Sequence, residues 1–262
     1  MLEAPCYVIS DVHLGVAGPE VERALVAFLR TLPGRAGSLL INGDLFDFWF
    51  EWRTVVPREH FRILAALADL RDAGLPVVML AGNHDCWGGE VLRDAVGLTY
   101  ELGAWRGVLG GWRAVVEHGD GLRRREDRSY RLLRAVLRHP LSVRAFRWLH
   151  PDAASRLARG SSTASRSHHV LGDSGVGLRA VALERLAADP TLELVVFGHS
   201  HAATVERAVS GGVYANAGSW LSEPTYLLVT PGRLELRRWN HSAEGECLHV
   251  VDRLPEKALA EL

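Results

Sequence analysis

Aspartate, histidine and asparagine side chains follow directly on five short apolar runs of this 262-residue chain. Seven of them could bind a metal ion: Asp11, His13, Asp44, Asn83, His118, His199 and His201. Carboxylate, imidazole and amide oxygen without a thiolate suit Mn, Fe, Zn or Co better than a structural cysteine–zinc site. Seven ligands exceed the needs of one ion, and they divide over two ions if one carboxylate bridges. Two neighbouring divalent ions commonly promote displacement at phosphorus.

Three further polar residues lie in the same clusters without being needed as ligands: Asp47, His84 and Asp85. His84 follows the predicted ligand Asn83, so we expect it to face the phosphate and to protonate or stabilise the leaving oxygen. We expect Asp85 to orient His84, and Asp47 to orient a metal ligand, as carboxylates behind metal-bound histidines do. His84, Asp85 and Asp47 are therefore the predicted catalytic residues.

Several of the clusters, taken alone, have a simpler explanation, although GNHD at 82–85 is harder to dismiss because two ionisable side chains would need partners at a strand end. The dipeptide GD at 43–44 is a common turn, and GHSH at 198–201 could be a surface turn. Taken together the clusters are harder to explain in this way, because ligands of open α/β sheets bind outside the carboxyl ends of the strands. Side chains that each follow a strand would converge on one edge of the sheet.

The apolar runs are short and rich in Val, Ile and Leu, which is typical of strands buried on both faces. Residues 19–32 and 57–74 each begin with proline and carry apolar residues at helical spacing, and 177–189 repeats the type. The core positions predicted within 57–74 are Phe61, Leu64, Leu67 and Leu70. Alternating strands and helices predict an α/β fold, and Pro231–Gly232 predicts the turn of a late hairpin.

Composition gives a broad frame. The formal net charge of −1 gives no argument for nucleic acid or for an acidic partner. Three cysteines, far apart and without C-x-x-C spacing, fit a reducing compartment. The N-terminal residues do not resemble a signal peptide, and no apolar run approaches the ~18 residues that a membrane span needs. We expect one cytoplasmic domain over residues 1–262.

The near-neutral total conceals a basic segment. Residues 121–170 contain twelve arginines and three acidic residues, which leaves 18 basic and 28 acidic residues for the rest of the chain. We predict two or three amphipathic helices within 122–172, inserted between core strands. Residues 126–138 place apolar and basic side chains on different helical faces: Tyr130, Leu133 and Leu137 against Arg131, Arg134 and Arg138.

Three roles are open for this insert. Its arginines could hold a diphosphate-containing substrate. Its amphipathic helices could lie on anionic lipid, which would make the protein peripheral on a membrane. The segment could also be a solvated surface whose apolar face packs on the core. A substrate linked to a lipid would use the first two roles together.

In chain order the motifs read D-x-H, GD-x-x-D, GNHD, H and GHSH, from residue 11 to residue 201. This set resembles the signature of the calcineurin-like metallophosphoesterases. The resemblance implies a four-layer α/β/β/α sandwich with two divalent ions. It implies that the first ion is held by Asp11, His13, Asp44 and His201. It implies that the second ion is held by Asp44, Asn83, His118 and His199, with Asp44 as the bridge.

A narrower resemblance rests on SDVHLG, GDLFDFW, the early HGD and the helical insert. These are similar to the UDP-2,3-diacylglucosamine pyrophosphatases of lipid A synthesis, in which the insert is a lid for acyl chains and the enzyme sits at the inner face of the cytoplasmic membrane. The similarity implies cleavage to UMP and 2,3-diacylglucosamine 1-phosphate, with Mn as the expected metal and Fe or Zn possible. The residues expected to bind substrate are Asn83, His84, Asp127, Tyr130, Arg166 and His199.

His84 departs from the narrower family, which typically carries arginine there. It favours the alternative of another phosphoesterase of the same fold, acting on nucleotides, cyclic nucleotides or other phosphoesters. A nuclease is less favoured, because there is no second basic patch and no aromatic interleaving of the kind that strand-binding grooves show. We expect no nucleic acid partner. A binding scaffold that has lost its chemistry would normally lack some ligands, whereas none of the seven positions is missing.

Overall fold

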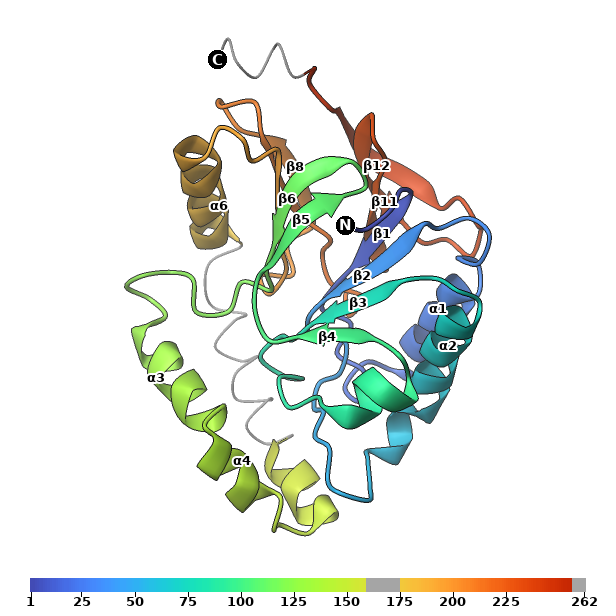
Figure 1. The fold of residues 1–262 in the computed structure, drawn as a ribbon, viewed down its shortest axis with the longest axis vertical. Coiled ribbons are helices and arrows are strands. Elements are labelled where there is room, and N and C mark those ends of the chain that lie inside the picture. The colour runs from blue at the N-terminus through green and yellow to red at the C-terminus, as the bar shows by residue number, and fades with distance from the viewer. Residues whose placement is uncertain (159–174, 256–262) are drawn as a thin grey trace.

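The computed structural model describes residues 1–158 and 175–255, whose strands form two sheets (Figure 1). The first sheet has the strand order β12-β11-β10-β1-β2-β3-β4 and the second has the order β5-β6-β7-β9-β8. The first sheet consists of β1 (Cys6–Ile9), β2 (Ser38–Asn42), β3 (Val77–Leu80), β4 (Thr99–Glu101), β10 (Thr225–Val229), β11 (Arg233–Arg238) and β12 (Glu246–Asp252). The second consists of β5 (Trp105–Leu109), β6 (Trp112–Val116), β7 (Leu194–Phe197), β8 (Thr204–Arg207) and β9 (Val213–Asn216).

Parallel pairing is found in the half of each sheet that carries the predicted ligands. Strands β1 to β4 are parallel neighbours, and β6, β7 and β9 are as well. Antiparallel strands β10, β11 and β12 extend the first sheet beyond β1. The turn between β10 and β11 contains Pro231 and Gly232, which confirms the predicted hairpin.

Helices cover the outer face of each sheet. On the first sheet, α1 (Pro19–Leu29) and α2 (Phe61–Asp72) pack on the strand side that carries Ile9 and Ile41. On the second, α6 (Val176–Ala188) packs on Val195 and Phe197. A further apolar core lies between the two sheets. The predicted four-layer α/β/β/α sandwich is therefore confirmed.

The strands are apolar on both sides because each lies between two layers. Successive side chains of a strand point to opposite faces, so in β1 Tyr7 joins the helix-side core while Val8 joins the core between the sheets. Every residue of β1, β2, β3, β7 and β9 is buried. Burying a side chain of this kind contributes roughly 1.5–3 kcal/mol, which holds the strand ends in fixed positions.

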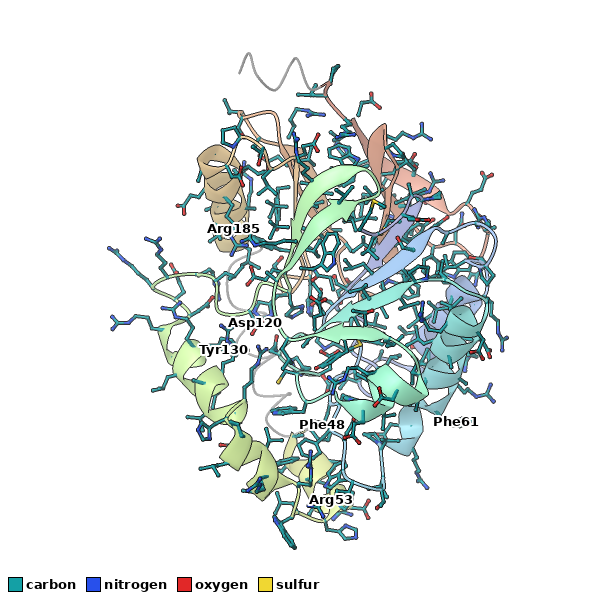
Figure 2. All side chains as sticks on the ribbon, in the orientation of Figure 1. Phe48, Arg53, Phe61, Asp120, Tyr130 and Arg185 are labelled. Atoms are coloured by element: carbon teal, nitrogen blue, oxygen red, sulfur yellow. The ribbon has the colours of Figure 1, made fainter. Side chains whose placement is uncertain are left out.

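The predicted helix over 57–74 is only partly right. It divides into a short 3-10 turn, η1 (Arg58–His60), and α2. Leu64, Leu67 and Leu70 are buried as expected, but Phe61 is 72% exposed and its assignment to the core is wrong. A spacing of three drifts by 60° at each step around a helix, so four such positions cannot all face the core. Phe61, at the start of α2, lies at the outer edge of the molecule (Figure 2).

The arginine-rich insert is helical where the structure describes it. It contains α3 (Arg128–Leu137), α4 (Pro140–Phe146) and helical residues 151–158. On α3, Leu132, Leu133 and Val136 are 70%, 51% and 54% exposed. Leu133, which belongs to the predicted apolar face, therefore does not pack on a core formed by the described residues. Among the described helices, none is long and apolar enough to cross a membrane.

An aromatic cluster joins the rest of the insert to the sandwich. It contains Phe48, Phe50 and Trp52 of the segment after β2, together with Ala154 of the insert. Phe146 of α4 packs against it, and its ring stacks on that of Trp87 with centroids 6.4 Å apart. The insert is thus attached through α4 and residues 151–158 by apolar contacts, whereas α3 has no buried residue of its own.

Candidate metal centre

Five strand ends position the predicted ligands. Asp11, Asp44 and Asn83 follow β1, β2 and β3 of the first sheet, while His118 and His199 follow β6 and β7 of the second. The clusters were expected at one edge of a single sheet, but they meet where the corresponding ends of two packed sheets adjoin. The site therefore depends on the packing of the two sheets against each other.

The backbone is left-handed at most of these positions. Among the described residues, positive φ values at non-glycine positions occur at His241 and at five predicted ligands: Asp11, His13, Asp44, His199 and His201. Each such residue costs roughly 1–3 kcal/mol and persists only where the surroundings enforce it. Bonds between loops provide that constraint: the Asp11 amide donates to the Gly43 carbonyl at 3.1 Å and the His13 amide to the Asp44 carbonyl at 3.0 Å.

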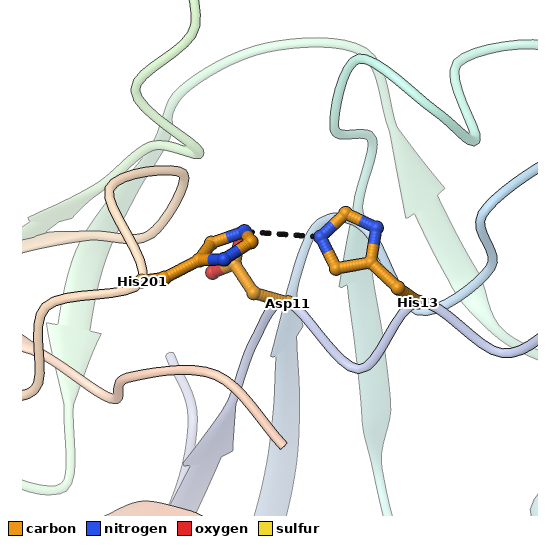
Figure 3. Close-up of side chains that lie close together, drawn as sticks. All are labelled: Asp11, His13 and His201. Atoms are coloured by element: carbon orange, nitrogen blue, oxygen red, sulfur yellow. Dashed lines mark hydrogen bonds and ion pairs between the residues drawn. The ribbon is translucent and has the colours of Figure 1, made fainter. Parts of the chain in front are cut away.

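Asp11, His13 and His201 form the first group of donors (Figure 3). The Nε2 atoms of His13 and His201 are 3.1 Å apart, and His201 Nε2 lies 3.4 Å from Asp11 Oδ1. Ligand atoms around an ion with bonds of ~2.1 Å lie roughly 3 Å from one another. The spacing and the chemistry of this group therefore fit a divalent cation.

Asp44, His118 and His199 form the second group. His118 Nε2 is 3.2 Å from Asp44 Oδ2 and 3.3 Å from the side-chain oxygen of Asn83. On the other side of the ring, His118 Nδ1 is 2.9 Å from the Asn42 carbonyl. That carbonyl can only accept, so Nδ1 carries the proton and Nε2 presents a lone pair to an ion. Asp44 Oδ2 is also 3.8 Å from His13 Nε2, which links the two groups.

Opposite charges compensate for burial in this cluster. Burial alone would raise the pKa of Asp44, but the charges of His118 and His84 hold that pKa well below its usual value. Burial alone would lower the pKa of His118, but the Asp44 charge raises it well above the usual value. Buried carboxylates and imidazoles that stabilise each other in this way can exchange protons for a cation.

Asp85 connects two of the ligand loops. Its buried carboxylate accepts hydrogen bonds from the amides of Gly82 and Leu45, both at 2.8 Å, and from those of Asp44 and Phe46 at 3.3 and 3.4 Å. These bonds join the loop that carries Asp44 to the loop that carries Asn83. That Asp85 orients His84 stays a prediction. The four hydrogen bonds of the Asp85 carboxylate are to backbone amides, so an effect on His84 would pass through the backbone.

Asp47 lies behind two histidines. Its Oδ1 is 3.7 Å from His13 Nδ1 and 3.7 Å from His84 Nδ1. The His84 ring nitrogen Nδ1 is also 3.0 Å from the Asp47 carbonyl, and the His84 amide donates to Asp44 Oδ1 at 2.9 Å. Because Nδ1 of His84 donates to the Asp47 carbonyl, Nε2 is the ring atom that can reach a substrate.

The residues expected to bind substrate fall into separate places. Three of them lie within or beside the two groups of metal ligands described above: Asn83, His84 and His199. Asp127 is 5% exposed and accepts bonds from the Arg123 amide and guanidinium, and Tyr130 donates to Asp120 Oδ2 at 2.8 Å. Arg166 lies outside the described residues.

The last residue of β9 and the loop that follows it support the site and were not predicted. Asn216 Nδ2 donates to the Gly198 carbonyl at 3.0 Å, and Ser219 Oγ donates to the Asp11 carbonyl at 2.8 Å. Both residues brace loops that carry ligands. Their sequence signal is the one that found the ligands, since the buried run VYA is followed directly by the polar NAGS.

Comparisons with known proteins show what the chain is similar to. The family model for calcineurin-like phosphoesterases matches residues 4–203. A UDP-2,3-diacylglucosamine hydrolase from Porphyromonas gingivalis is 33% identical over 220 residues, covering 76% of this chain and 84% of the relative. One from Pseudomonas putida is 30% identical over 216 residues, covering 81% and 89%. A dimetal phosphatase from Danio rerio covers 95% of this chain and 98% of its own, at 12% identity and a TM-score of 0.47.

The family match spans all five ligand loops and most of the chain. The chain therefore belongs to the calcineurin-like phosphoesterase family and is a metal-dependent phosphohydrolase.

Proposed function

We propose that this protein hydrolyses the diphosphate of UDP-2,3-diacylglucosamine, giving UMP and 2,3-diacylglucosamine 1-phosphate. The observation that carries the proposal is the alignment of relatives with UDP-2,3-diacylglucosamine hydrolase activity over about four-fifths of the chain. The helical insert beside the donor groups supports it, because it offers both basic and apolar side chains to a substrate that has a charged and an apolar part.

The cofactor in this proposal is a pair of divalent ions, with Mn first. Asp11, His13, Asp44 and His201 would hold one ion. Asp44, Asn83, His118 and His199 would hold the other. When bound, such a pair supplies Lewis acidity toward the phosphate and makes water acidic enough to be a nucleophile near neutral pH. The oxygen and nitrogen donors without thiolate support Mn, and they also suit Fe and Zn.

His84 is the proposed proton donor to the leaving phosphate oxygen. Its Nδ1 contact with the Asp47 carbonyl fixes the ring, so that Nε2 can be presented to the substrate. Asp47 would orient His13 through its carboxylate, whose Oδ1 lies 3.7 Å from His13 Nδ1. Asp85 would keep Asn83 and Asp44 at a constant separation, because it accepts amides from both loops.

The exposed side of the insert is the proposed contact with lipid. A groove of ≈ 870 Å³ lies between the segment after β2 and α4, with Arg53, Arg144 and Arg147 in its wall and no acidic residue among the described residues that line it. Trp148 borders this groove and is 88% exposed. Arginine and tryptophan together suit the headgroup region of an anionic membrane. In this proposal the protein is cytoplasmic and peripheral on the inner membrane face, and the insert is a lid over the acyl chains.

Substrate comparison tests the proposal. The Mn-loaded protein is given UDP-2,3-diacylglucosamine in detergent and, separately, bis-p-nitrophenyl phosphate, and the release of UMP or nitrophenol is measured. Turnover of the lipid far above that of the generic ester supports the proposal. Turnover of the generic ester alone would support the alternative that His84 favours, a phosphoesterase for other nucleotides or phosphoesters.

Liposome flotation tests the lipid contact separately. Vesicles that contain phosphatidylglycerol are compared with neutral vesicles at low salt, and we expect the protein to float only with the anionic vesicles. Replacing Trp148 by Ala should weaken binding, because an exposed indole anchors at the interface. Absence of binding to anionic vesicles at low salt would contradict this part of the proposal without affecting the hydrolysis.

A further inference from the structure

Asp120 connects the helical insert to the donor groups. It lies two residues beyond His118 and is 5% exposed. Its Oδ2 accepts from the Tyr130 hydroxyl at 2.8 Å and from Arg134 Nη1 at 3.1 Å, and its carbonyl accepts from the same Arg134 atom at 2.7 Å (Figure 2 shows Tyr130 beside Asp120). Helix α3 is thus bonded to the loop that carries His118.

Arg138, directly after α3, reaches a second ligand loop. Its Nη2 donates to the Gly82 carbonyl at 3.2 Å and is 3.5 Å from Asp120 Oδ2. Gly82 immediately precedes Asn83, and the Asn83 side-chain oxygen is 3.3 Å from His118 Nε2. One guanidinium group therefore spans the two loops whose ligands already touch each other.

We propose that Arg138 and Asp120 are positioning residues for the second metal ion. Together they hold the loops of Asn83 and His118 at the separation that this ion requires, so the placement of α3 sets the ion's affinity. The inference rests on the proposed two-ion centre. Arg138 acts through the ligand loops, since its guanidinium contacts the Gly82 carbonyl and the Asp120 carboxylate.

The first ion should be insensitive to this clamp. Two of its ligands that are not shared with the second ion are braced from elsewhere: the Asp11 carbonyl by Ser219, and His13 by Asp47. In the described contacts of Arg138, neither Asp11 nor His13 takes part. A loss of the clamp is therefore expected to separate the two affinities, whereas a general loss of stability would weaken both.

Calorimetric titration of the metal-free full-length chain with Mn²⁺ tests the inference. We expect two ions per wild-type chain. In Arg138→Met, one ion should bind as in wild type and the other at least tenfold more weakly, with loss of the spin-coupled Mn–Mn signal in electron paramagnetic resonance. Asp120→Asn should have the same selective effect, and Arg138→Lys should restore part of the affinity.

Arg128→Met is the matched control, because Arg128 is an exposed arginine of the same helix. It should bind both ions as wild type does. If Arg138→Met binds two ions with wild-type affinity, the inference is wrong, while the proposed two-ion centre is unaffected. Equal weakening of both ions in Arg138→Met and Asp120→Asn would overturn it as well. Fewer than two ions in the wild type would instead refute the proposed two-ion centre, and the inference with it.

Discussion

The helical insert contacts the ligand loops of His118 and Asn83, but the two regions are stabilised in different ways. In the loops, carboxylates such as Asp85 are buried and hydrogen-bonded to the backbone, and left-handed residues are held by bonds between loops. In the insert, α3 exposes its leucines and is attached by arginines. The difference teaches that donor atoms for a metal need fixed positions, whereas a helix that is held by the hydrogen bonds of its arginines can leave its leucines exposed.

The largest effect should come from Asp44→Ala. Asp44 contacts both donor groups, so its loss should abolish binding of the ion pair and reduce turnover by about 10³-fold or more. Metal content by elemental analysis and hydrolysis of the lipid substrate measure this. Asp72→Ala, at an exposed position at the end of α2, is the control. Two ions retained by Asp44→Ala would contradict the bridging role.

His84→Ala should leave the metal centre intact while lowering turnover by about 10²-fold or more, as expected for loss of a positioned proton donor. Turnover and metal content are measured on the same sample. Because the His84 amide, not the ring, bonds to Asp44, the substitution keeps that contact. Loss of metal from this variant would show that His84 is a ligand and would contradict its proposed role as proton donor.

Asp85→Ala tests how much the hydrogen bonds between the ligand loops contribute to the free energy of unfolding. Four amides would lose their acceptor in a buried place, which should lower the free energy of unfolding by about 3 kcal/mol or more. Urea denaturation of the metal-free chain measures this, with the exposed Asp94→Ala as control. A change below about 1 kcal/mol would mean that the loops do not depend on these bonds.

The smallest effect is expected in the insert. Leu133→Ala on α3 should change the free energy of unfolding by no more than about 0.5 kcal/mol, because this side chain is half exposed. Leu67→Ala in the buried stripe of α2 should cost about 2–5 kcal/mol in the same denaturation experiment. Comparable losses in both variants would mean that α3 packs its apolar side in solution, and the contrast between the two regions would fail.

The sequence by itself determined the buried strands and the ligand candidates, and the sandwich was predicted through the resemblance to a known family. A strand buried on both faces must be apolar throughout, and polar residues can follow only where it leaves the core. The ends of five such runs therefore identify side chains such as Asp44 and His118 without knowledge of the tertiary structure. The same pattern marks Asn216 and Ser219, which follow the buried run VYA.

Only the tertiary structure decided which side of α3 faces the protein. The helix is amphipathic in either orientation, so the sequence leaves both open. In the fold, the Gly82 carbonyl and the Asp120 carboxylate need donors, and Arg134 and Arg138 provide them, while Leu132 and Leu133 do not pack on any core of the residues that the structure describes. The contacts of Asp85 and Asp47 were likewise decided by which loops the fold brings together, because hydrogen bonds between distant segments leave no local pattern in a sequence.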